Sequence, residues 1–83
     1  MAANTARLNA VIAALEKVRE HVDNLADDVE VDITTYNRWI GMLDGVVEGS
    51  WKNLMLEGDV IPATEMLMHT DAAIAFLEGC REA

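Results

Sequence analysis

Carboxylates are the most numerous residues in this 83-residue chain whose type and spacing could support chemistry. Glu16 and Glu20 are four residues apart, as are Asp23 and Asp27, so each pair shares one face of a helix. Paired carboxylates supply the oxygen ligands that magnesium prefers. A second acidic helix with the matching spacing is missing, so we interpret these acids as solvated surface residues.

The histidines and the cysteine are not grouped as metal ligands or catalytic residues. His21 and His69 fall on different expected helices, and neither has a second His or Cys ligand one helical turn away. Cys80 has no neighbouring histidine that could act as its base. The stretch GMLDGVVEG lacks the Lys-Ser/Thr ending of a phosphate-binding loop. We therefore expect no enzyme, no metal and no cofactor.

Two family resemblances bear on these residues. The acids of residues 16–27 resemble the helical acids that hold magnesium in all-α nucleotide pyrophosphohydrolases, apart from the missing second helix. The size and acidity of the chain are similar to those of an acyl carrier protein. That resemblance implies a phosphopantetheine-bearing serine in an Asp-Ser-Leu motif at the start of a helix. Ser50, in EGSWKN, is the central candidate, and both of its neighbours, Gly49 and Trp51, depart from the motif.

Composition and charge narrow the class of partner. Hydrophobic residues make up 52% of the chain, above the usual range of about 45–50%, which indicates partners or self-association. Fifteen acids against six bases give a net charge of −9. This disfavours direct binding to nucleic acid or an anionic membrane and favours basic proteins as partners. One cysteine, no visible signal peptide and no long apolar run indicate the cytoplasm.

Apolar residues recur at spacings of three and four over residues 8–29, which is one helix face held over three heptads. They are Leu8, Val11, Leu15, Val18, Val22, Leu25 and Val29. The pattern predicts a helix over about 5–28. Gly58 and Pro62 predict the end of one helix and the start of another, over about 62–80. We expect a single all-α domain over residues 1–83, either a three-helix bundle or a helical hairpin plus a third helix.

The middle of the chain allows two interpretations. VEVDITTY alternates apolar and polar residues as a strand does, and Asp44-Gly45 could form a hairpin turn. Against this, a three-four spacing continues from Ile33 to Leu54, and a lone strand pair would leave short, unprotected edges. We favour one helix over about 33–56.

Three glycines in that segment, Gly41, Gly45 and Gly49, recur at every fourth position. In a continuous helix they would form a face without side chains, on which a second helix could pack closely; the alternatives are a kink or a turn. Aromatic residues flank this face and a wide apolar arc covers the third expected helix. The predicted partner or self-interface comprises Tyr36, Trp39, Gly41, Gly45, Gly49, Trp51, Met68, Ala72 and Phe76.

The sequence thus predicts a non-catalytic interaction protein, an adaptor or inhibitor that binds a protein partner stoichiometrically and forms a homodimer or higher oligomer. By analogy of size and composition alone, such adaptors or inhibitors include those that bacteriophages encode against host systems, and for a phage protein the location would be the host cytoplasm. The alternative is an inhibitor that mimics nucleic acid with its acidic run. That run consists of Asp23, Asp27, Asp28, Glu30 and Asp32.

Overall fold

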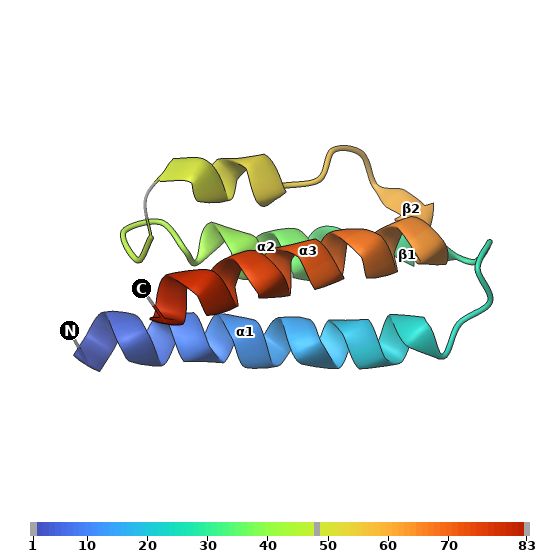
Figure 1. Cartoon of the computed structure of the whole chain (residues 1–83). Helices are drawn as coiled ribbons and strands as arrows, with labels where there is room; N and C mark the ends of the chain where they lie inside the picture. Colours follow the sequence, from blue (N-terminus) through green and yellow to red (C-terminus); the bar gives the residue numbers. More distant parts are fainter. Residues whose placement is uncertain (1, 48, 83) are drawn as a thin grey trace.

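The computed structural model describes residues 2–47 and 49–82, which form three α-helices, one short 3-10 helix and two strands (Figure 1). The α-helices are α1 (Ala2–Asp23), α2 (Thr34–Gly41) and α3 (Ala63–Glu82). The 3-10 helix η1 (Gly49–Leu54) follows α2 in the chain, and strands β1 (Glu30–Asp32) and β2 (Val60–Pro62) precede α2 and α3. In Figure 1, η1 lies on the opposite side of α2 from α1.

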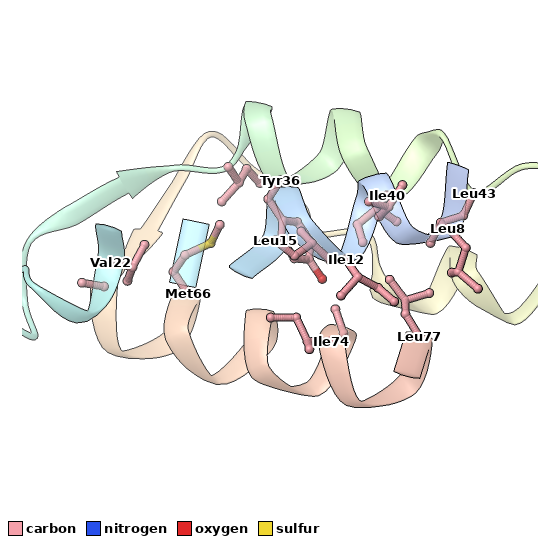
Figure 2. Packing of buried hydrophobic residues seen from close by; sticks show 14 residues of the cluster. Leu8, Ile12, Leu15, Val22, Tyr36, Ile40, Leu43, Met66, Ile74 and Leu77 are labelled. Atoms are coloured by element: carbon pink, nitrogen blue, oxygen red, sulfur yellow. The ribbon is translucent and has the colours of Figure 1, made fainter. Parts of the chain in front are cut away.

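The core lies where the three α-helices meet, with their apolar side chains pointing toward one another (Figure 2). The long helices α1 and α3 pack along each other in opposite directions, so that Arg19 contacts Asp71 and Arg81 contacts Asn9. The apolar pattern of α1 is reflected in its burial, because four members of the predicted face, Leu8, Val11, Leu15 and Val22, are buried. The buried apolar residues of the three helices are Leu8, Val11, Ile12, Leu15, Val22, Tyr36, Ile40, Ala63, Met66, Ala73, Ile74 and Leu77.

The expectation of an all-α chain is wrong, because β1 and β2 form a two-stranded antiparallel sheet. Val31 pairs with Ile61, and the ladder is extended by hydrogen bonds from Ile33 N–H to the Asp59 carbonyl and from Ala63 N–H to the Val29 carbonyl. The objection that short edges would be unprotected fails for a physical reason. Each strand has only three residues, and acidic side chains on β1 and Pro62 on β2 disfavour further strand pairing.

The single helix predicted over 33–56 is also wrong, because α2 ends at Gly41 and a turn separates it from η1. Gly45 adopts a φ of 80°, which a helix does not contain and which residues other than glycine rarely adopt. Leu43 lies in the turn after α2, and its side chain is fully buried in the core. An apolar residue is therefore needed at this position although it is not helical, and the apolar spacing continues past the end of α2. The turn at Asp44-Gly45 therefore exists, although β1 pairs with β2 rather than across this turn.

The first helix is shorter at its C-terminal end than the predicted range of 5–28. Asn24 donates a side-chain hydrogen bond to the Glu20 carbonyl at 2.9 Å, which satisfies one of the free carbonyls at the helix end. A longer helix would place Asp27 and Asp28 at its negative end, where carboxylates are unfavourable. The third helix begins one residue after, and ends two residues after, the predicted range of 62–80.

Candidate functional site

An open, mainly apolar groove of about 820 Å³ lies between α1 on one side and β1 and α2 on the other. One wall is the face of α1 that carries Ala10, Ala14 and Val18. The other wall includes Tyr36 and Trp39 of α2. Met66 of α3 also lines the groove and is only 1% exposed, so it lies at the base.

The groove exists because small side chains of α1 face large ones of α2. Alanines at positions 10, 13 and 14 follow the three-four spacing that keeps side chains on one side of a helix. They leave room opposite Trp39, which is half-buried. Next to these alanines on α1 lies the apolar face that packs against α3. The helix α1 therefore contributes one side to the core and an adjacent side to the groove.

Charged residues line one part of the groove. Lys17 and His21 of α1 lie on one side, and Glu30 and Asp32 of β1 lie on the other; all four are exposed. Asp32 also has a structural role, because its Oδ1 accepts a hydrogen bond from Thr34 N–H at 2.7 Å at the start of α2. Hydrogen bonding to Thr34 lowers the pKa of Asp32 below its usual value.

Two polar side chains of α2, which forms one wall of the groove, make hydrogen bonds to the backbone of residues 54–56. The Tyr36 hydroxyl donates a hydrogen bond to the Leu54 carbonyl at 2.7 Å. The Asn37 amide donates to the Leu56 carbonyl and accepts from Leu56 N–H, both at 2.9 Å. Burial raises the pKa of Tyr36 to about 12. These bonds fix α2 against residues 54–56, so the backbone that carries Trp39 is held in place.

The structure separates the residues that the sequence placed in one interface. Tyr36 and Trp39 lie in the groove, whereas Trp51 is half-buried in η1. Met68 and Ala72 are exposed on α3, and Phe76 beside them is half-buried.

The three glycines do not share a helix face. Gly41 ends α2, Gly45 lies in the turn and Gly49 begins η1. Contact of these glycines with a partner stays a prediction. Ser50, the candidate for a phosphopantetheine arm, lies in η1, and its side chain is outside the described residues.

The predicted acidic face forms the connection from the end of α1 through β1. All five of its acids are exposed. In the part of the chain that the structure describes, the ion pairs are Arg19–Asp71 at 3.3 Å and Arg81–Glu78 at 3.7 Å, so none of the five is paired. Asp23 also lines a second, polar cleft of about 530 Å³ between α1 and α3.

Sequence reasoning missed the alanine wall of the groove. The signal was present as Ala10, Ala13 and Ala14 on α1, but alanine is also the best helix former and its spacing carries no functional meaning alone. Only the position of Trp39 opposite these alanines makes them part of a site.

No family model matches the chain, and no curated protein or solved structure is significantly similar to it. Among the described residues, no helix is both long and apolar enough to cross a membrane, and no cluster of His, Cys, Asp and Glu could hold a metal ion.

Proposed function

We propose that this chain is a non-catalytic interaction protein, an adaptor or inhibitor, that binds a protein partner stoichiometrically through the groove between α1 and α2. The observation that carries the proposal is the open groove with a half-buried tryptophan on its wall. Aromatic anchors in apolar pockets supply much of the binding energy at protein interfaces. A groove between helices is also a recurrent site for a partner's apolar segment.

A substitution inside the groove tests this function. Ala14→Glu places a larger, charged side chain at a half-buried position in the groove, and glutamate is a good helix former. Ala75→Glu makes the same change at an exposed position of α3 that does not line the groove, so it is the matched control. Circular dichroism and thermal melting establish that both variants fold.

The binding assay has two stages. The wild-type protein is immobilised, proteins captured from a lysate of its source or host cell are identified by mass spectrometry, and each candidate is purified. Isothermal titration calorimetry then measures its affinity for the three forms. We expect a one-to-one complex that Ala14→Glu weakens by about tenfold or more, equivalent to about 1.4 kcal/mol, and that Ala75→Glu leaves unchanged. A purified partner that binds all three forms equally would refute the groove as the binding site.

A second candidate function, mimicry of nucleic acid, is favoured by the five exposed acids that run from the end of α1 through β1, none of which forms an ion pair among the described residues. A mimic relies on charge, so its complex weakens steeply as salt concentration rises, whereas an apolar groove contact persists. The double variant Asp27→Asn, Asp28→Asn removes two of these charges at exposed positions. Unchanged partner affinity in this variant would reject mimicry.

An exposed apolar stripe on α3 supports self-association of the chain. The stripe formed by Met68, which is 60% exposed, and the exposed Ala72 lies on α3 away from the groove. It offers an apolar surface for a second copy of the chain. We also place the protein in the cytoplasm, because a single cysteine fits a reducing compartment.

A further inference from the structure

We propose that the occupant of the groove is an amphipathic α-helix of a basic protein, with Lys or Arg side chains beside Glu30 and Asp32. This inference rests on the proposed function and names the partner segment. Its first support is the shape of the groove. The α1 wall runs from Ala10 to Val22, which corresponds to about 18 Å at the rise of an α-helix. A partner helix of three to four turns matches this length.

Backbone hydrogen bonding favours a helix over an extended peptide. An extended peptide needs backbone partners in its binding site, whereas a helix satisfies its own N–H and C=O groups internally. The long wall of the groove comes from α1, and the lining residues of this wall lie in the interior of the helix, where the backbone groups are already hydrogen-bonded within it. The strand β1 contributes only three residues, which is too short an edge to hold an extended segment along the groove.

The two walls also suit the profile of a helix. Ala10, Ala13 and Ala14 let an incoming backbone approach α1 closely, because their side chains are short. The half-buried Trp39 on the opposite wall supplies an apolar surface against which longer side chains can pack. Tyr36 beside it is only 1% exposed, so it supports the wall and adds little surface of its own.

Charge complementarity identifies the partner as basic. Glu30 and Asp32 line the groove at β1, and Lys17 on the α1 wall supplies one opposing charge, so acids prevail over Lys and Arg in the lining. The exposed Asp27 and Asp28 precede Glu30 in the chain and add to the negative charge at this end. The whole chain carries a net charge of −9, which attracts a basic partner over longer distances. The positive end of a helix dipole is its N-terminus. We therefore place the N-terminal turn of the occupant beside Glu30. In this orientation, both the positive end of the helix dipole and the basic side chains of the occupant lie next to the acids of the groove.

A second copy of this chain is disfavoured as the occupant. The exposed apolar stripe that it could insert, on α3, contains Met68 and Ala72 and is flanked by the exposed acids Glu65 and Asp71. Inserting this stripe would bring acids toward Glu30 and Asp32. Like charges placed across an interface oppose association.

Three synthetic peptides test the inference. The first is an amphipathic peptide of about 14 residues, a length set by the groove, composed of Leu, Ala and Lys with Lys concentrated in its first turn. The second has Glu in place of every Lys, and the third has the composition of the first in a scrambled, non-amphipathic order. Affinities are measured by calorimetry. In a Trp51→Phe background, Trp39 is the one remaining indole, and its emission reports directly on the groove.

We expect the cationic amphipathic peptide to bind about tenfold or more tightly than the other two and to shift Trp39 emission to shorter wavelength. Glu30→Gln should weaken its binding about two- to fivefold, as expected for one exposed ion pair, whereas Glu57→Gln, at an exposed position outside the groove, should not. Ala14→Glu should weaken the binding although it adds a negative charge, and Ala75→Glu should not. Ala10→Glu, also in the groove, provides a second variant should Ala14→Glu fail to fold.

Several outcomes would overturn the inference. Tighter binding to Ala14→Glu than to wild type would show that the peptide adsorbs by charge alone. Equal affinity for the cationic and anionic peptides would refute a basic partner, and failure of all three to bind would refute a helical occupant. Conversion of an oligomer to a monomer by Ala14→Glu would identify a second copy in the groove. The proposed function is judged separately, by the binding of a purified cellular partner to Ala14→Glu and Ala75→Glu.

Discussion

Asn37 is the residue whose substitution tests most directly how the groove wall is held. Its amide makes two hydrogen bonds with the backbone of Leu56, each 2.9 Å long and partly buried. Asn37→Ala removes both bonds and leaves a backbone N–H and a carbonyl of the 54–56 segment without these partners. We therefore expect α2 to loosen from residues 54–56.

The magnitude follows from the number of bonds lost. A typical hydrogen bond contributes about 1 kcal/mol net, so two contribute about 2 kcal/mol. Alanine is a better helix former than asparagine and returns about 0.5 kcal/mol, so we expect a loss of about 1.5 kcal/mol. For a domain of this size, that loss lowers the melting temperature by about 6–12 °C.

Urea unfolding followed by circular dichroism measures the change in stability, and amide exchange by NMR localises it to the Leu56 N–H. Asn53→Ala is the matched control, because Asn53 is exposed on η1 and makes no side-chain hydrogen bond in the described structure. Its stability should stay within about 0.5 kcal/mol of the wild type. Equal unfolding midpoints for the two variants, or undiminished protection of Leu56 in Asn37→Ala, would refute the reasoning.

Three further predictions concern other parts of the molecule. Tyr36 is the only tyrosine, so the absorbance of its phenolate measures its pKa directly. Because the pKa of about 12 in the folded protein exceeds the usual value of 10, the free energy of unfolding should fall as pH rises from 10 to 12. Tyr36→Phe should remove this dependence on pH. Gly45→Ala should lower the free energy of unfolding by about 1 kcal/mol, because Gly45 has a positive φ that alanine rarely adopts. Gly79→Ala should raise it by about the same amount, because Gly79 lies in α3 with open space around the added carbon. Thermal melting measures both changes. Light scattering at two concentrations should give a mass of at least two chains, reduced by Met68→Lys; a single-chain mass at both would exclude the predicted self-association.

The long helices were predictable because their apolar residues repeat locally. Leu8, Val11 and Leu15 are buried as the heptad pattern predicts, and α3 follows closely after the break at Gly58. The sheet was not predictable to the same degree, because Val31 pairs with Ile61, thirty positions away in the sequence. The alternation in VEVD was a correct strand signal, but a three-residue partner strand carries too little pattern of its own to be recognised.

The length of the second helix was predicted to be too great, because a buried apolar residue in a turn can continue the spacing that is typical of a helix. Leu43 is fully buried at a position that suits both interpretations, and only the backbone conformation of Gly45 distinguishes them. The aromatic part of the site, Tyr36 and Trp39, was recognisable by residue type. The alanine wall was not, because it becomes a site only through the arrangement of α1 against α2.

The acidic connection between α1 and α2 contains residues that support the fold and residues that contribute only surface charge. Asp32 hydrogen-bonds to the start of α2, so removing its carboxylate would disturb the fold as well as the surface charge. Asp27 contributes to the fold through its backbone carbonyl, which accepts a hydrogen bond from Thr64 N–H, and its side chain stays exposed. Glu30 points to the same side of β1 as Asp32, while Val31 between them packs against the core. Charge can therefore be removed at Asp27, Asp28 and Glu30 without removing a hydrogen bond that supports the fold. A loss of partner affinity in those variants would report on the charge of the groove's acidic edge itself.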